Sequence, residues 1–64
     1  MSIDVTFLIA AFNAEETIAR AIGSALAQEG VDAEVIVVDD CSSDSTATIV
    51  EAFPDERVRV IRLG

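Results

Sequence analysis

Hydrophobic residues along this chain change their spacing several times, and each change predicts a boundary between a strand and a helix. The segment 3–9 reads I-D-V-T-F-L-I, which begins with polar and apolar residues in alternation and ends as a continuous apolar run. Such a run, rich in β-branched and aromatic side chains, predicts a strand that is buried on both faces toward its end. The apolar runs at 35–38 and 58–63 predict a second and a third strand.

The segment between the first two predicted strands has the spacing of an amphipathic helix. From 14 to 28 the apolar residues recur every three or four positions, while the charged residues lie mostly off this stripe. Asn13, with Glu16 three residues later, resembles a capping box and predicts where the helix begins. Gly30 is the predicted C-cap. The stripe consists of Ile18, Ala21, Ile22, Ala25 and Leu26.

A second, shorter helix is predicted between the second and third strands. Ser42 or Ser43 can cap it, and Pro54 ends it because proline cannot continue a helix. The resulting order β-α-β-α-β predicts an α/β fold with a parallel sheet and right-handed crossovers. Two helices are too few to cover both faces of such a sheet, so we expect residues 1–64 to be the front of a larger, truncated domain. The apolar stripe of this helix consists of Thr46, Ile49, Val50 and Phe53.

Composition narrows the classes of partner and chemistry. The 64 residues carry a formal charge of −8, with no Lys and no His. An acidic chain repels nucleic acid, so we expect no nucleic-acid partner. Without histidine the Ser-His and Cys-His nucleophile pairs are excluded. The single cysteine rules out an internal disulfide and favours a reducing compartment, and no apolar run approaches the ~20 residues of a membrane span.

Two short segments follow the first and second predicted strands directly: 10–15, which reads A-A-F-N-A-E, and 39–44, which reads D-D-C-S-S-D. Ligands of open parallel sheets bind beyond the carboxyl ends of the strands, so neighbouring strands would bring these two loops into one crevice. Asp39 and Asp40 come directly after the second predicted strand. Successive residues of an extended chain point to opposite faces, so one aspartate can face a ligand while the other braces the loop.

Other nucleotide and phosphate sites fit this arrangement less well. A dinucleotide-binding Rossmann unit needs glycines between its first strand and helix, and none occurs here. Glu15 and Glu16 fall in the predicted first helical turn, where they would repel phosphate. The G-x-x-x-x-G-K phosphate loop is absent, and a phosphorylation receiver domain has its acidic pair after the first strand rather than the second. The Rossmann-like fragment is kept as an alternative.

The order of these motifs resembles the N-terminus of family 2 glycosyltransferases. The chain reads V-T-F-L-I-A-A-F-N-A-E-E-T-I-A-R-A-I-G-S-A-L-A-Q and then E-V-I-V-V-D-D-C-S-S-D-S-T. The family pattern is an apolar strand, Pro-x-Tyr/Phe-Asn, a helix ending in Leu-x-Gln, and V-V-D-D-G-S-x-D-x-T. The opening M-S-I-D and the A-R-A-I-x-S-A-L-A-Q run are most similar to bacterial exopolysaccharide glucosyltransferases of the succinoglycan type. The resemblance implies the N-terminal, Rossmann-like half of a GT-A nucleotide-diphospho-sugar transferase fold.

The resemblance also implies roles for individual residues. The ring of Phe12 would pack near uracil, and Asp40 would accept a hydrogen bond from the uracil N3–H, which a charged acceptor strengthens. Glu15 would reach a ribose hydroxyl, Asp39 would brace its loop, and Asp44 would cap the second helix. The predicted nucleotide-contacting residues are therefore Ala10, Ala11, Phe12, Glu15, Asp40 and Cys41.

The chain departs from the family pattern at two of these positions. Ala10 replaces a frequent proline, and Cys41 replaces the usual glycine. If position 41 requires a positive φ, its Cβ costs about 1 kcal/mol or somewhat more. Without the resemblance, the same residues would be interpreted as solvated strand-end charges and a packed aromatic ring. Arg57, Arg59 and Arg62 would be interpreted as charges on an exposed edge strand rather than as a diphosphate site.

The enzyme implied by the resemblance is an inverting glycosyltransferase of exopolysaccharide or cell-surface polysaccharide synthesis. It would transfer glucose from UDP-glucose to a saccharide or lipid-linked acceptor, with a divalent metal (Mg or Mn) bound by ligands outside this chain. Neither the metal-binding Asp-x-Asp motif nor a residue matching the catalytic base occurs in the sequence, so we expect residues 1–64 alone to be inactive. A cytoplasmic location is expected, at the inner face of the membrane through regions not present here. The alternative is a non-catalytic α/β module that forms homo-oligomers through an open sheet edge or uncovered apolar faces.

Overall fold

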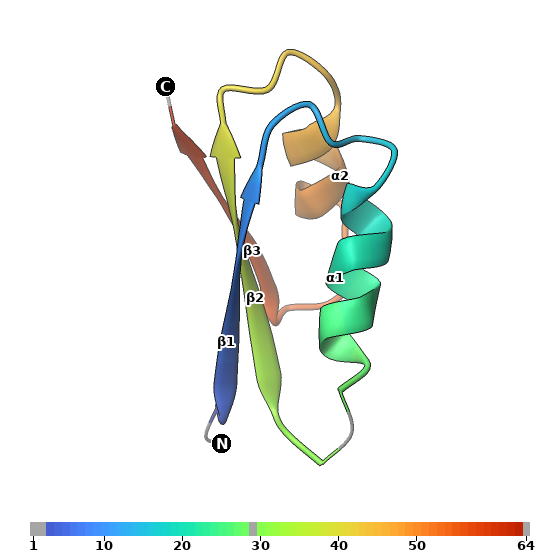
Figure 1. Cartoon of the computed structure of the whole chain (residues 1–64), viewed down its shortest axis with the longest axis vertical. Coiled ribbons are helices and arrows are strands. Elements are labelled where there is room, and N and C mark those ends of the chain that lie inside the picture. The colour runs from blue at the N-terminus through green and yellow to red at the C-terminus, as the bar shows by residue number, and fades with distance from the viewer. Residues whose placement is uncertain (1–2, 29, 64) are drawn as a thin grey trace.

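Strands and helices alternate along the chain in the computed structural model, which describes residues 3–28 and 30–63 (Figure 1). The predicted order β-α-β-α-β is confirmed. Met1 and Ser2, which open the M-S-I-D similarity, lie outside the described residues. The elements are β1 (Val5–Ala11), α1 (Ile18–Leu26), β2 (Ala33–Asp40), α2 (Thr46–Glu51) and β3 (Val58–Leu63).

The strands form one parallel sheet in the order β1-β2-β3. β1 pairs with β2 from Val5 opposite Ala33 to Ala11 opposite Asp39. β2 pairs with β3 as far as Asp40 opposite Leu63. The carboxyl ends of all the described strands therefore lie at the same edge of the sheet, as the sequence predicted.

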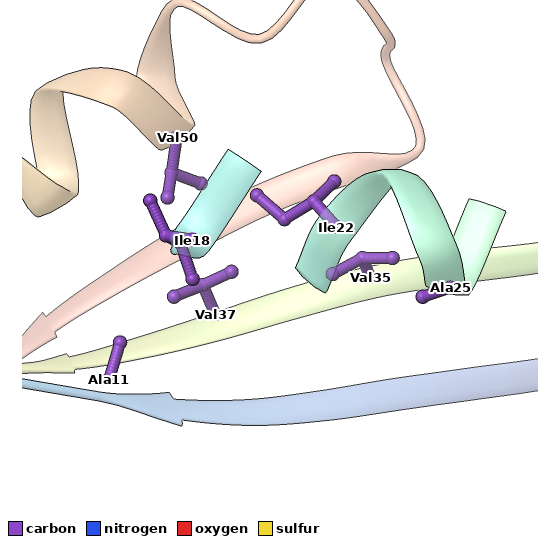
Figure 2. Packing of buried hydrophobic residues seen from close by; sticks show 7 residues of the cluster. All are labelled: Ala11, Ile18, Ile22, Ala25, Val35, Val37 and Val50. Carbon is purple, nitrogen blue, oxygen red and sulfur yellow. The ribbon is translucent and has the colours of Figure 1, made fainter. Parts of the chain in front are cut away.

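Both helices pack on the same face of the sheet (Figure 1). Two consecutive crossovers of the same hand, progressing in one direction across the sheet, place their helices on one side. The core lies between the sheet and this helical layer, where Val35 and Val37 of β2 are fully buried beneath Ile18 and Ile22 of α1 (Figure 2). The complete cluster consists of Ala11, Ile18, Ile22, Ala25, Val35, Val37 and Val50.

The opposite face of the sheet has no covering layer among the described residues. Leu8 of β1 is 70% exposed, and Ile61 and Leu63 of β3 are 50% and 48% exposed. The sequence predicted strands buried on both faces, and for the described residues this was wrong. The reason is topological, because apolar side chains on both faces of a strand can be covered only if helices lie on both sides.

The first helix is shorter than the predicted segment 14–28. The carbonyl oxygen of Ala14 accepts hydrogen bonds from the N–H groups of Thr17 and Ile18, at 3.0 and 2.8 Å, and α1 begins only at Ile18. Its N-cap is Thr17, which makes no capping hydrogen bond with its side chain. The predicted capping box at Asn13 and Glu16 is therefore not formed.

The end of α1 also differs from the prediction. The helix ends at Leu26 with Ala27 as its C-cap, whose N–H donates to the carbonyl oxygen of Gly23. Gly30 has the left-handed φ of 79° that a C-cap glycine would have, but it lies in the connection to β2 rather than at the helix end. Pro54 follows α2, but the helix already ends at Glu51, so Phe53 of the predicted apolar stripe lies beyond it. Neither helix of the described residues is long and apolar enough to cross a membrane.

Candidate functional site

The loops after β1 and β2 leave the sheet side by side. Ala11 and Asp39 are register partners, so Phe12 and Asp40 are the next residues along two neighbouring parallel strands. Both loops arch over the same end of the molecule, toward the helices (Figure 1). The expectation that the two loops meet at the carboxyl edge of the sheet is confirmed.

Each loop turns through a residue with left-handed backbone conformation directly after these positions. Asn13 has a φ of 48° and Cys41 a φ of 58°. Asparagine adopts this conformation more readily than most side chains, whereas cysteine pays the full steric penalty of its Cβ, about 1–2 kcal/mol. Position 41 therefore does require a positive φ, and glycine would suit this position better than cysteine.

Asn13 binds the second loop instead of capping α1. Its backbone N–H donates to the Oγ of Ser42 at 2.8 Å. Its side-chain Oδ1 accepts the backbone N–H of Ser43 at 2.9 Å and lies 3.3 Å from the Ser43 hydroxyl. The prediction of a helix cap at Asn13 was wrong because the side chain has a better partner in a loop that is 30 residues away in sequence.

A second pair of contacts joins the residues that precede the two helices. The N–H of Glu15 donates to Asp44 Oδ2 at 3.2 Å, and the N–H of Ser45 donates to Glu15 Oε1 at 3.0 Å. Each loop thus supplies a carboxylate to a backbone N–H of the other. The N–H of Ala14 also donates to the Oγ1 of Thr46 at 2.8 Å.

The N-cap position of α2 is Ser45, whose side chain makes no capping hydrogen bond, and Asp44, one residue earlier, accepts the N–H of the first helical residue instead. Its Oδ1 accepts the backbone N–H of Thr46 at 2.9 Å and also the Thr46 hydroxyl. Neither Ser42 nor Ser43 caps this helix, because both are engaged by Asn13. Desolvation acts to raise the pKa of Asp44, but the hydrogen bonds from Thr46 and from the Glu15 N–H outweigh it and hold the pKa below its usual value.

The two adjacent aspartates occupy different environments. Asp39 is 4% exposed, and its carboxylate accepts the hydroxyl of Ser42. Asp40 is exposed. Alternation along β2 sends their side chains to opposite faces, which places Asp39 under the loops and leaves Asp40 accessible to a ligand.

The other predicted nucleotide-contacting residues are distributed around the same edge. Phe12 is 62% exposed, and Ala10 and Cys41 are also exposed. Ala11 is 5% exposed and belongs to the core, so only its backbone is available to a ligand. Glu15 is exposed, but one of its carboxylate oxygens is already engaged by Ser45.

A hollow of about 390 Å³ lies beside the loops, on the side of the turn that precedes α1. Glu15, Glu16 and Asp44 contribute to its wall, whereas Phe12 and Asp40 do not. Its three carboxylates disfavour an anionic ligand such as a diphosphate. Sequence reasoning predicted that the two loops meet, but it placed the ligand at Phe12 and Asp40 and did not predict a hollow on the side of Glu15, Glu16 and Asp44.

Two arginines of the predicted basic cluster have acidic partners. Arg57 pairs with Asp55 at 2.8 Å, and Arg62 pairs with Glu51 of α2 at 2.6 Å. The hydrogen bonds from Arg57 lower the pKa of Asp55 to about 2. Within residues 3–28 and 30–63 no group of three or more His, Cys, Asp or Glu side chains could hold a metal ion, so no metal ligand is assigned among them.

Comparison with known proteins places this geometry in a family. The family model described as "Glycosyl transferase family 2" matches residues 6–64. The chain is 65% identical over 60 residues to the succinoglycan biosynthesis protein ExoO of Rhizobium meliloti (strain 1021), covering 94% of this chain and 17% of that protein. It is 48% identical over 61 residues to the succinoglycan biosynthesis protein ExoU of the same organism, covering 92% of this chain and 18% of that protein.

A third relative comes from Escherichia coli and has a more explicit name. It is the UDP-Glc:alpha-D-GlcNAc-diphosphoundecaprenol beta-1,3-glucosyltransferase WfaP, 38% identical over 58 residues, covering 91% of this chain and 23% of that protein. The chain thus spans about a fifth of the length of the curated relatives it matches. Its parallel α/β sheet agrees with the N-terminal half of a GT-A fold. On the sequence match and this topology, the chain belongs to glycosyl transferase family 2.

Proposed function

We propose that the two loops at the carboxyl edge of the sheet bind the uridine part of a UDP-sugar donor. The observation that carries this proposal is the placement of two exposed residues at neighbouring strand ends: Phe12 directly follows β1, and Asp40 is the last residue of β2, which pairs with β1 in parallel. A nucleobase can bind both groups at the same time, because its face can pack against the aromatic ring while its edge donates a hydrogen bond to the carboxylate.

The charge of Asp40 suits uracil in particular. Uracil has an N–H donor at N3, which a carboxylate oxygen accepts in a charge-assisted hydrogen bond. Cytosine has an unprotonated acceptor at N3, which would face the same carboxylate without a proton between them. The proposed site therefore selects UDP over CDP. Glu15 is proposed to reach a ribose hydroxyl with the carboxylate oxygen that Ser45 does not engage, and Ala10, the Ala11 backbone and Cys41 are proposed to line the base.

For the protein that carries this segment, we propose inverting transfer of glucose from UDP-glucose to a saccharide or lipid-linked acceptor in exopolysaccharide synthesis. The name of ExoO supports a role in exopolysaccharide synthesis, and the name of WfaP supports UDP-glucose as the donor. In this proposal residues 1–64 form the N-terminal, nucleotide-binding part of the GT-A domain. No catalytic base and no ligand to a divalent metal is assigned to these residues. The free, exposed thiol of Cys41 supports a cytoplasmic location.

The direct test is a titration of the ¹⁵N-labelled chain with UDP and, separately, with CDP. We expect amide shifts concentrated at Phe12 and Asp40, with UDP binding more tightly than CDP. Asp40→Ala should abolish the difference between the two nucleotides, because it removes the acceptor for N3–H. The matched control is Asp32→Ala, which removes an exposed carboxylate just before β2, at the opposite end of that strand.

Three results of this titration would count against the nucleotide site. The first is the absence of amide shifts at millimolar UDP, or shifts scattered over the helices. Equal affinity for UDP and CDP in the unsubstituted chain would remove the proposed role of Asp40. An Asp32→Ala variant that lost binding as Asp40→Ala does would show that net charge, rather than the position of the carboxylate, determines affinity.

We also propose that two copies of the chain associate through the uncovered sheet face. The exposed Leu8, Ile61 and Leu63 support this proposal, because exposed apolar side chains clustered on one face favour association. Sedimentation of the chain at increasing concentration should show dimers, and Leu8→Lys should shift the equilibrium toward the monomer. Thr48→Lys, at an exposed position of α2 on the covered side, is the matched control. A chain that stays monomeric throughout would remove this proposal.

A further inference from the structure

One hydrogen bond within the second loop and one between the two loops form a chain, and the single proton of the Ser42 hydroxyl sets its direction. Asp39, only 4% exposed, accepts the hydroxyl proton of Ser42. A hydroxyl has one proton to donate, so Ser42 Oγ can serve the other loop only as an acceptor. It does so for the backbone N–H of Asn13, at 2.8 Å. The first loop is therefore tied through Ser42 to a carboxylate fixed at the end of β2.

Asn13 holds the second loop a second time with its side chain. Oδ1 accepts the N–H of Ser43 at 2.9 Å, while the backbone of Asn13 stays at a φ of 48°. Asparagine combines a tolerated left-handed backbone with a short amide acceptor, and this position uses both properties. Glycine would supply the backbone conformation alone, and alanine would supply neither.

These contacts lie directly beside the two side chains of the proposed nucleotide site. Phe12 precedes Asn13 in the chain, and Asp40 is separated from Ser42 only by Cys41. Any displacement of Asn13 relative to Ser42 therefore changes the spacing between the aromatic ring and the carboxylate. Asp39 lies at a buried position and the Asn13 N–H is already engaged by Ser42, so neither group is assigned a contact with the base itself.

We propose that Ser42 and Asn13 are positioning residues that fix the Phe12 turn against the Asp40 turn before a nucleotide binds. This inference rests on the proposed binding of UDP between those turns. Loops that are already ordered do not lose conformational entropy when the ligand arrives, so the bonds between them raise affinity without touching the ligand. Asp39 is the anchor of the chain of hydrogen bonds and acts through Ser42.

The test compares UDP affinity in Ser42→Ala and Ser42→Thr by NMR titration of the whole chain, below the unfolding transition. Ser42→Ala removes the Oγ that serves both Asp39 and Asn13, and we expect it to weaken UDP binding by about tenfold because the loops must then become ordered when UDP binds. Ser42→Thr keeps the hydroxyl and should restore affinity to within about twofold of the unsubstituted chain, as a tolerated substitution would. Hydrogen exchange at the Asn13 amide should be slow in the original and Thr chains and fast in the Ala chain.

A control for stability separates positioning from a merely structural role. Val50→Ala creates a cavity in the core, where Val50 is 2% exposed, without altering either loop. It should lower stability while leaving the UDP affinity of the folded chain within about twofold. If Ser42→Ala does not fold, Asn13→Gly serves in its place. It keeps the backbone conformation and the bond to Ser42 but removes the bond to Ser43, and should weaken UDP binding by a smaller factor.

The outcomes distinguish this inference from the function on which it rests. If the original chain gives no UDP shifts, the nucleotide site fails and the positioning role fails with it. If the original chain binds UDP and Ser42→Ala binds equally well, the nucleotide site stands and the positioning role is overturned. The same conclusion follows if Ser42→Thr keeps a slowly exchanging Asn13 amide but does not restore affinity.

Discussion

Substitution of Cys41 by glycine should stabilise this protein although it removes a side chain. Cys41 has a φ of 58°, where a Cβ costs about 1–2 kcal/mol. Glycine relieves this strain but increases the conformational entropy of the unfolded chain, which costs about 0.4–1 kcal/mol. The side chain of Cys41 is exposed, so little burial is lost. The difference between these two ranges is about 0–1.6 kcal/mol, and we expect a net gain near its centre, about 0.8 kcal/mol.

Cys41→Ala is the reference for this measurement, because alanine removes the thiol but keeps the strained Cβ. It should match the original chain to within about 0.5 kcal/mol. For a chain of this size the glycine variant should melt about 3–7 °C higher than the alanine variant. The assay is thermal and urea unfolding followed by circular dichroism, with reductant present to keep the thiol free.

A glycine at an exposed position with ordinary backbone conformation provides the opposite control. Glu56 is exposed and is not among the described residues with positive φ, so Glu56→Gly should destabilise the chain by about 0.4–1 kcal/mol. If Cys41→Gly were no more stable than Cys41→Ala, the backbone at position 41 would not be strained as the structure shows. If Glu56→Gly were equally stabilising, the effect would not come from φ.

Two further predictions concern the core and the ion pair before β3. Ile22→Val, at a position with 0% exposure, should lower the free energy of unfolding by about 1 kcal/mol. Ile61→Val, at 50% exposure on the uncovered face, should lower it by less than half as much. Equal losses would mean that the uncovered face is buried in solution. The pKa of Asp55 is lowered from 3.8 to about 2 by Arg57, so the pair stabilises the fold above pH 3.8 and this stability is lost as the pH falls toward 2. Unfolding midpoints measured across this range should fall less steeply in Asp55→Asn, and an unchanged slope would contradict the pairing.

The sequence by itself determined the order of elements and the end of the sheet where ligands could bind. Apolar runs at 58–63 and 35–38 located β3 and the centre of β2, because the spacing of buried side chains depends only on local backbone geometry. The parallel arrangement followed from connection lengths and handedness. The separate environments of Asp39 and Asp40 followed from alternation along an extended strand, and this difference was predictable without coordinates.

Only the tertiary structure decided which partners the loop residues take and which face of the sheet is covered. Asn13 has the local signature of a helix cap, yet its side chain binds Ser43 across 30 residues of sequence. The local sequence pattern could not predict this contact, because the hydrogen-bond partner of a polar side chain depends on which groups the tertiary structure places next to it. The exposure of Leu8 could not be predicted from the sequence either. Apolar character is a property of the residue, whereas its burial depends on what packs against it.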